Sequence, residues 1–278
     1  MLGLLTIWQQ TGIFKTEAKR PRRGHQKGQF MYIRAAGQQY TRFLDQLHSE
    51  RLFNWYMEVG CRTGRTFAAV RSKTIAVDPF FLTENNIIYS KPALHVFQTK
   101  SDDFFESGFL KKLGIKLSFS FLDGMHLFEY LLRDFMHTEA NSAADSVIAL
   151  HDCCPASNEM TTRDLDNLPK RAWTGDVWKL IPILQEYRPK LKITVLDCKP
   201  TGLVLVSGLD PKNTVLAKNY DAILAKYMDI TLETYGPEKF YGSFNYTNAR
   251  EFRDAGYPLF DKCSIANELA LIPTKVSP

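Results

Sequence analysis

The chain has 278 residues, of which 45% are hydrophobic and 23% charged, a composition that excludes disorder for most of its length. Its longest apolar stretches run fewer than ten residues, too short to cross a bilayer, so no transmembrane segment is predicted. The formal net charge is +5, and a segment near the N-terminus accounts for all of it. The neutral remainder makes nucleic acid an unexpected partner, because a nucleic-acid channel needs a basic stripe.

The basic segment runs from Lys15 to Lys27 and holds six basic residues and one acid. We interpret residues 1–30 as a basic N-terminal leader, solvated and flexible around Pro21 and Gly24 rather than built to bind phosphates. The opening MLGLLTIW has no basic residue ahead of it and no small-residue cleavage site before the basic run. We therefore expect it to form a short docking helix or strand rather than a cleaved signal.

Five cysteines are present, and two of them, Cys153 and Cys154, are adjacent. An odd count without a CxxC pair argues against both a disulfide framework and a zinc ribbon. A reducing compartment fits this pattern best, so we predict a cytoplasmic protein.

Helical and strand-like segments alternate along the first half of the chain. A helix over 32–52 is predicted by Phe43, Leu44 and Leu47, which lie about one turn apart. Five strands follow, over 55–60, 73–79, 93–99, 117–124 and 146–152. Helices are expected between them, over 66–72, 102–114 and 127–140. This alternation predicts an α/β fold with a mostly parallel sheet and helices on both faces.

The pattern changes after the fifth strand. Residues 155–175 are polar and punctuated by Pro and Gly, which predicts a loop or a lid. A helix over 176–187 is expected to kink at Pro182. Strands over 192–198 and 203–208 flank the sequence KPTG, a hairpin signal that places an antiparallel pair at one edge of the sheet.

Residues 209–278 form a C-terminal helical and irregular extension, with one clear helix over roughly 214–228. The extension is too small and irregular to be named a separate domain. We expect it to pack on the main domain or on a partner subunit, so a homo-oligomer is a possible state.

The first strand ends in a loop of the form G-x-x-x-G, from Glu58 through Gly60, Arg62 and Gly64 to Thr66. Glycine lets the backbone turn sharply and approach a ligand closely. The opening of the next helix, with its N–H groups and the Thr66 hydroxyl, suits an anionic group. The second and third glycines of the dinucleotide motif GxGxxG are absent, so the loop alone is equally compatible with a plain strand-to-helix turn.

Two further strand ends add to this loop. Asp78 ends the second strand, twenty positions after Glu58, where a carboxylate can accept both hydroxyls of a ribose. Together they favour an adenosine-type ligand. Ser101 and Asp102 follow the third strand, where they can cap the next helix and also lie over an adenine.

The fourth and fifth strands end in two carboxylates and two imidazoles, from Asp123, His126, His151 and Asp152. Because parallel strands end at one edge of the sheet, these groups are expected to converge. They are candidate catalytic residues, as a general base or as ligands of a divalent metal. Oxygen ligands would favour Mg²⁺ or Mn²⁺, and the imidazoles would also admit iron or zinc.

Five segments together resemble the class I methyltransferase family known as methyltransferase domain 24. They are YMEVGCRTGRTF, IAVDPF, FQTKSDDFF, FLDGMHLFEYLLRDF and VIALHDCCP. WTGDVWK and the PTGLVLV hairpin resemble it too, so the likeness covers roughly residues 53–208. It implies a Rossmann-like class I methyltransferase fold with a seven-stranded sheet whose last strand is antiparallel. Residues 31–208 would then be the methyltransferase domain.

The resemblance also implies a cofactor site for S-adenosylmethionine. Glu58, Gly60 and Gly64 would hold it, with Asp78 on the ribose and Ser101 and Asp102 near the adenine. We add the loop residues Arg62 and Thr66, and Asp123 at the next strand end, to this predicted site.

Related sugar O-methyltransferases carry a divalent metal, and the corresponding positions here are Asp123, His151 and Asp152. The chain departs from the family pattern at His151-Asp152, where metal-dependent relatives more often show two acids. It also has residues 141–145 where the family has Pro-Gly-Gly.

Three functions follow as hypotheses. The leading one is an S-adenosylmethionine-dependent O-methyltransferase acting on a small hydroxylated acceptor such as a sugar or glycan unit. In it, His151 or His126 would act as general base, or a bound Mg²⁺ would activate the hydroxyl instead. The alternatives are an NAD-type oxidoreductase on a similar fold and a binding or assembly protein with a vestigial cofactor pocket.

Overall fold

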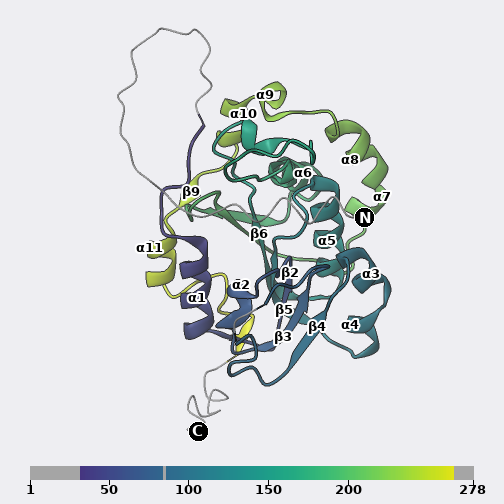
Figure 1. Ribbon diagram of the computed structural model, residues 1–278, viewed down its shortest axis with the longest axis vertical. Helices are drawn as coiled ribbons and strands as arrows, with labels where there is room; N and C mark the ends of the chain where they lie inside the picture. Colours follow the sequence, from purple (N-terminus) through teal and green to yellow (C-terminus); the bar gives the residue numbers. More distant parts are fainter. Residues whose placement is uncertain (1–31, 84–85, 266–278) are drawn as a thin grey trace. The chain divides into compact units, whose positions relative to one another are not determined.

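A computed structural model describes residues 32–83 and 86–265 of the chain. The predicted basic leader and the last part of the C-terminal extension lie outside the described residues. The described part is built around one main β-sheet with helices on both faces (Figure 1).

The parallel part of the sheet confirms the predicted α/β fold. Its strands are β2 (Trp55–Val59), β3 (Lys73–Val77), β4 (Leu94–Phe97), β5 (Leu117–Leu122) and β6 (Ser142–His151). They are ordered β4-β3-β2-β5-β6, so the chain moves outward from β2 and then returns to β5 on its other side. This reversal is a topological switch point, where open α/β sheets bind ligands beyond the carboxyl ends of the strands.

The predicted antiparallel hairpin completes the sheet. It consists of β7 (Lys192–Leu196) and β8 (Leu203–Ser207), and β8 pairs antiparallel with β6. The expected seven strands with an antiparallel final strand are therefore present. The hairpin is not the edge, however, because β9 (Tyr246–Thr247) from the C-terminal extension pairs in parallel with β7. A two-residue strand carries too little pattern to be recognised in a sequence.

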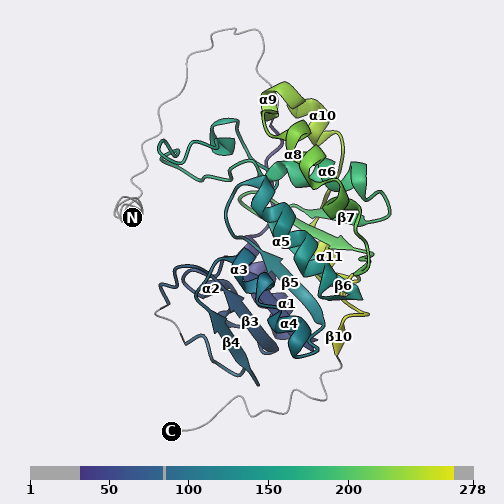
Figure 2. The same ribbon diagram turned by 90° about the vertical axis from the view of Figure 1, so that its right-hand side faces the viewer.

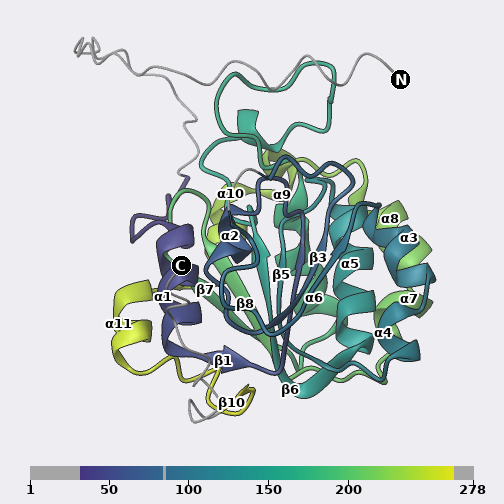
Figure 3. The ribbon, with the colours of Figure 1, turned by 60° about the horizontal axis from the view of Figure 1, so that its bottom comes forward.

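The helices divide between the two faces of the sheet, as Figure 3 shows. One face is covered by α3 (Ser101–Glu106), α4 (Phe109–Lys112), α5 (Phe128–Ala140), α6 (Leu180–Tyr187), α7 (Val215–Lys218), α8 (Tyr220–Tyr227), α9 (Leu232–Tyr235) and α10 (Pro237–Tyr241). The other face is covered by α1 (Tyr40–Glu50), α2 (Arg65–Ala68) and α11 (Ala249–Asp254). Strand side chains alternate between these cores: Met57 and Val59 face the first and Tyr56 the second.

The C-terminal extension packs against both faces. Helices α8, α9 and α10 lie around α6 (Figure 2), where Ile223, Leu232 and Phe240 are fully buried in the first core. Helix α11 lies beside α1, with the Phe252 ring 6.1 Å from that of Phe43. Strand β10 (Ser264–Ile265) pairs with β1 (Leu52–Phe53) in a separate two-stranded sheet.

The first helix begins later than predicted, at Tyr40 rather than near residue 32. The preceding segment is held extended by long-range backbone bonds: the Gly37 N–H donates to the Asp197 carbonyl at 2.7 Å. Gln39 also forms a parallel bridge with Lys199. These partners come from the distant hairpin, so the helix predicted from local spacing alone was too long.

Three other helix predictions also need correction. The helix expected over 102–114 divides into α3 and α4 because Gly108 adopts a positive φ of 68°. The helix expected over 214–228 divides at Asn219. No kink is required at Pro182. A 3₁₀ turn (Val177–Lys179) precedes α6, so the proline falls in the first turn of α6, where its missing N–H costs little. Across the described ranges, no helix is both long and apolar enough to span a membrane.

Candidate functional site

The loops after β2 and β5 meet at the switch point of the sheet. Gly60 has a φ of +89°, and its N–H donates to the Val77 carbonyl at 3.0 Å. A Cβ at Gly60 would lie 1.9 Å from the Asp123 carbonyl oxygen, a distance that no side chain tolerates. Glycine is therefore required here by the close approach of the two loops as well as by the left-handed backbone.

Asp78 shapes the predicted cofactor loop through its carboxylate. One oxygen accepts a hydrogen bond from the Arg62 N–H at 2.7 Å and the other from the Phe80 N–H at 2.6 Å. Each carboxylate oxygen can accept a second bond, so the bonds made within the described residues leave two acceptor positions over. Gly64, at a φ of +75°, then turns the chain into the short helix α2. Asp78 thus joins the loops after β2 and β3, the place expected for a ribose.

Glu58 and Thr66 point inward, toward the core beneath the loop. The fully buried Glu58 carboxyl accepts hydrogen bonds from the Tyr56 hydroxyl at 2.6 Å and from the Thr66 hydroxyl. Burial raises the pKa of Glu58 to about 8, although these two hydrogen bonds oppose the shift. The Thr66 hydroxyl is thus engaged inside the protein, and α2 is only four residues long. The pair supports the loop from below.

Ser101 and Asp102 begin α3, after β4, but neither caps it, because Lys100 is the N-cap residue and makes no side-chain capping bond. Asp102 instead forms a two-pronged ion pair with Arg133 of α5, at 2.8 and 2.7 Å. The hydrogen bonds from Arg133 lower the pKa of Asp102. Arg133 also donates to the Tyr220 hydroxyl at 2.6 Å. Asp102 is thus committed to holding α3 against α5.

The four groups predicted after β5 and β6 do converge, and we call them the acid–imidazole cluster: Asp123, His126, His151 and Asp152. Nδ1 of His151 lies 3.2 Å from Asp123 Oδ1 and 3.5 Å from Asp152 Oδ1. Nε2 of His126 lies 3.5 Å from Asp123 Oδ1 and 3.2 Å from Asp152 Oδ2. The two carboxylates are therefore bridged by two imidazoles.

The charges in this cluster shift one another. Burial alone would raise the pKa of both acids, but His151 above all holds the pKa of Asp123 and of Asp152 below the usual range. Burial alone would lower the pKa of both histidines. The two carboxylates instead raise the pKa of His126, and they raise the pKa of His151 to about 10. The cluster therefore favours positive charge between its carboxylates.

His126 is held in one tautomer. Its Nδ1 lies 2.9 Å from the Trp173 carbonyl oxygen, which can only accept, so Nδ1 carries a proton. In the neutral ring, Nε2 then offers its lone pair toward the two carboxylates. Ligand atoms of Asp123, His126 and Asp152 all lie within 4.8 Å of one another. The metal prediction named His151, whereas the imidazole in this trio is that of His126.

His151 is more enclosed than His126, at 6% exposure of its side chain against 21%. Nδ1 faces the acids, while its buried Nε2 has no hydrogen-bond partner among the described residues. The Tyr40 ring lies over the imidazole with 3.9 Å between centroids. His151 thus occupies the inner side of the cluster, beneath α1.

Sequence reasoning missed two residues that touch the cluster. Tyr40 was placed in a helix, but nothing in its neighbourhood indicated that it would cover His151. Thr201, from the β7–β8 hairpin, donates its hydroxyl to Asp152 Oδ1 at 2.6 Å. The only signal for Thr201 was its place in the PTGLVLV resemblance. Asp152 also has a left-handed φ of 58°, unusual for a residue other than glycine.

The polar segment 155–175 reaches the cluster through Trp173, whose ring centroid lies 4.9 Å from that of His126. The Trp173 indole N–H donates to the Thr162 carbonyl at 2.8 Å. Arg163 binds Glu129 and Asp176 at 2.7 Å each, which ties the segment to the start of α5. Figure 2 shows the segment, in teal, projecting from the rest of the protein at the upper left.

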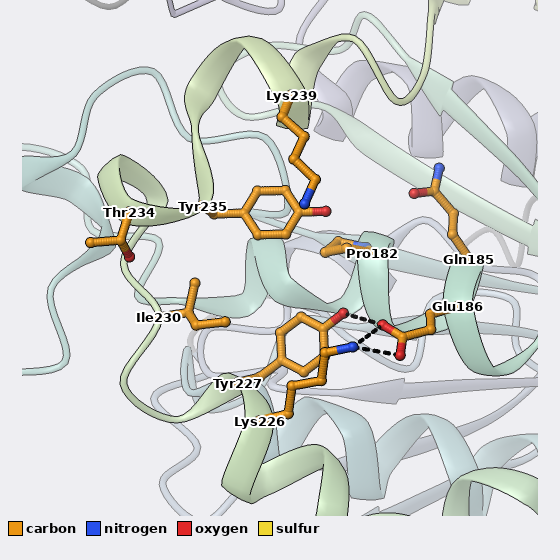
Figure 4. Close-up of a pocket in the computed structure, with 9 residues that line it drawn as sticks. All are labelled: Pro182, Gln185, Glu186, Lys226, Tyr227, Ile230, Thr234, Tyr235 and Lys239. Carbon is orange, nitrogen blue, oxygen red and sulfur yellow. Dashed lines mark hydrogen bonds and ion pairs between the residues drawn. The ribbon is translucent and has the colours of Figure 1, made fainter.

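A separate pocket of about 550 Å³ lies among α6, α8, α9 and α10 (Figure 4). Its walls include Tyr227, whose hydroxyl donates to Glu186 at 2.8 Å, and Tyr235, whose ring lies 4.4 Å beneath the Lys239 ammonium. None of the predicted site residues lines it. Its aromatic rings are already in contact with lysines of the chain itself.

No family model matches the chain, and no curated protein matches it. Several solved structures resemble it. An O-methyltransferase from Bacillus cereus in complex with SAH is 13% identical, over 60% of this chain and 79% of that one, with a TM-score of 0.43. The O-methyltransferase TomG from Streptomyces achromogenes, in complex with SAM, is 15% identical over 60% and 78%, with a TM-score of 0.42.

The methyltransferase MycE, in complex with Mg, SAH and mycinamycin VI, is 9% identical, and the match covers 63% of this chain and 49% of MycE, with a TM-score of 0.41. Identities and TM-scores this low carry no argument about the reaction.

Proposed function

We propose that this chain is an S-adenosylmethionine-dependent methyltransferase that methylates a hydroxyl of a small acceptor, such as a sugar or glycan unit. The observation that carries the proposal is the position of the acid–imidazole cluster, directly beside the Gly60–Asp78 loops at the switch point. The proposed sites for an adenosine-type ligand and for activation of a hydroxyl would thus share the carboxyl edge of the sheet. The resemblance to methyltransferase domain 24 is part of this proposal.

The donor half would be bound by the loops after β2 and β3. Gly60 lets the loops after β2 and β5 come together beside this position, and the two remaining acceptor positions of Asp78 suit two ribose hydroxyls. The loop has only the first of the three glycines that the dinucleotide motif requires, so the NAD alternative is not favoured. Methyl transfer from a sulfonium is an in-line displacement, for which the protein mainly aligns donor and acceptor and excludes water.

The acceptor half would be bound at the acid–imidazole cluster. Because His126 Nδ1 donates to Trp173, the neutral ring would turn its Nε2 lone pair toward two carboxylates, and either the imidazole proton or a bound metal ion would supply the positive charge between them. Oxygen and imidazole donors fit a divalent ion such as Mg²⁺, held by Asp123, His126 and Asp152. When bound, such an ion would lower the pKa of the acceptor hydroxyl.

The surrounding residues would orient this site. Trp173 holds the His126 ring, and Thr201 holds one oxygen of Asp152. Tyr40 and Trp173 place apolar ring surface on opposite members of the cluster, His151 and His126, which limits the access of water. Arg163 fixes the segment that carries Trp173.

Calorimetric titration with SAH, the product of the cofactor, and with NAD tests the donor half. We expect binding of SAH and none of NAD, and Asp78→Ala should weaken SAH about 100-fold because two hydrogen bonds to a charged acceptor are lost. Asp164→Asn, in the exposed 155–175 segment, serves as the control and should bind like the wild type. Binding of neither cofactor would favour the assembly-protein alternative.

Metal removal tests the acceptor half. We expect chelation with EDTA to abolish methyl transfer to a panel of sugars and glycans, and added Mg²⁺ to restore it. The donor half should stay intact, so the affinity for SAH should change little. Transfer that survives chelation would remove the cation from the proposal.

A further inference from the structure

Exposed apolar side chains gather on three segments of the described chain. The segments follow β3, β5 and β6, over residues 78–93, 123–127 and 152–176. They carry more than half of the large apolar side chains that are exposed in the described ranges: Phe80, Leu82, Ile88, Tyr89, Met125 and Leu165. Single exposed apolar residues are ordinary on a protein surface, whereas such a concentration marks a place of contact.

Parallel topology brings these three segments out at one edge of the sheet. Strands β3 and β5 run parallel to β2, and β6 runs parallel to β5, so all three end at the edge where the candidate site lies. Leu113 offers a contrast, because it precedes β5 and so lies at the opposite edge. Its exposed fraction, 58%, equals that of Leu82.

The exposed apolar residues adjoin groups of the candidate site. Phe80, whose side chain is 74% exposed, donates its N–H to Asp78 Oδ1 at 2.6 Å. The Leu82 N–H donates to the Arg62 carbonyl, in the loop after β2, at 2.8 Å. Met125, 42% exposed, lies in the loop after β5 between two members of the acid–imidazole cluster. Apolar surface therefore borders both halves of the site.

The segment after β3 is also almost free of charge. Glu84 is the only charged residue in the sequence from 79 to 90. Lys91, which follows, is buried, and its ammonium donates to the Ala68 carbonyl at 2.9 Å. This segment therefore offers little to a charged partner and much to an apolar one.

The position of the apolar surface decides what occupies it. A second copy of the chain or a membrane lying on Phe80 and Met125 would cover the carboxyl edge and shut an acceptor out of the candidate site. An apolar portion of the acceptor itself can lie there while the site is in use.

We propose that the acceptor is an amphiphile: its hydroxyl reaches the acid–imidazole cluster, and an apolar portion lies on Phe80 and Leu82. The substrate class is thus a glycan unit joined to an alkyl or aryl group, rather than a free sugar. This inference rests on the proposed function, because it assumes that an acceptor is methylated at this edge of the sheet.

Calorimetry with octyl β-glucoside and methyl β-glucoside tests the inference, because the two ligands share a sugar and differ only in the length of the alkyl tail. Both are used below the concentration at which octyl glucoside forms micelles. We expect octyl glucoside to bind about 30-fold more tightly, since burial of two or three methylene groups contributes about fourfold for each. The measurement requires neither cofactor nor turnover. Equal affinities would contradict an apolar subsite.

Substitutions locate the tail. Phe80→Ser and Leu82→Ser should each weaken octyl glucoside about fivefold to tenfold, because each removes apolar contact area, and should leave methyl glucoside within about twofold of the wild type. The matched control, Leu113→Ser, removes an equally exposed leucine at the opposite edge and should change neither affinity. Equal losses in Leu82→Ser and Leu113→Ser would mean that the tail binds apolar surface anywhere, which the inference forbids.

The outcomes separate the two proposals. A wild-type chain that does not bind SAH would overturn the proposed function and, with it, the assignment of an acceptor. A chain that binds SAH without preferring octyl glucoside would overturn this inference alone. A dimer in sedimentation velocity that Leu82→Ser dissociates would assign the surface to a second copy instead. Binding to phosphatidylcholine vesicles that the same variant abolishes would assign it to a membrane, and either result rejects the amphiphilic acceptor.

Discussion

The two halves of the candidate site are built in different ways. After β2 and β3, the polar side chains are satisfied by the protein itself: Asp78 accepts two backbone N–H groups, and Glu58 accepts two hydroxyls. After β5 and β6, two acids and two imidazoles crowd one another, and Nε2 of His151 has no partner among the described residues. The first half is shaped by backbone geometry and is suited to binding, whereas the second concentrates charge and is suited to chemistry.

The substitution with the largest expected effect on this contrast is Asp123→Asn, which removes the negative charge that both imidazoles contact. We expect kcat to fall about 10³-fold, because activation of the acceptor hydroxyl is lost. The affinity for SAH should fall less than about tenfold, since the backbone contact of Asp123 with Gly60 is retained. Steady-state kinetics and calorimetry measure the two effects. An equal loss in both would show that the halves are not separate in function.

A second test changes only the backbone of the binding half. Gly60→Ala would place a Cβ 1.9 Å from the Asp123 carbonyl oxygen. Its matched control is Gly114→Ala, which has a comparable φ of +63° but no atom within 4 Å of the added Cβ. We expect the control to lose about 1 kcal/mol of unfolding free energy and Gly60→Ala about 2–3 kcal/mol more, measured by urea denaturation. Equal losses would mean that the loops separate easily.

The third test concerns Glu58 and depends on pH. Its pKa is raised to about 8 in the folded chain, from an ordinary value of 4.5. The folded state therefore keeps a proton that the unfolded state releases, and this contribution to stability is lost as pH rises from 4.5 to 8. Glu58→Gln should gain in melting temperature relative to the wild type between pH 5 and about pH 9. A difference that does not vary with pH would contradict the shift.

Much of this fold could be predicted from the sequence, because the ends of the strands carry strong local signals. Each apolar strand of the parallel sheet stops within a few residues of a Gly or an Asp, and parallel topology then brings those ends to one edge. The sequence therefore predicted that Asp123, His126, His151 and Asp152 lie close together. The roles of these residues toward a cofactor or a metal stay predictions.

Features that depend on distant partners could not be read in the same way. The start of α1 is set by backbone bonds to Asp197 and Lys199, and the covering of His151 depends on where that helix then places Tyr40. The inward turn of Thr66 depends on Glu58. Local spacing carries no information about such long-range contacts, so these side chains were placed on the right element without the right neighbour.

The pairing of β1 with β10 has a consequence for how the chain matures. Leu52 emerges from the ribosome long before its partner Ile265. Strand β9, which closes the sheet edge beside β7, also arrives late. Until α11 has been synthesised, one face of the sheet in the nascent chain lacks part of its cover. Phe43 and other apolar side chains are then exposed and prone to aggregation. Chaperone demand during translation should accordingly persist until the C-terminal extension is complete.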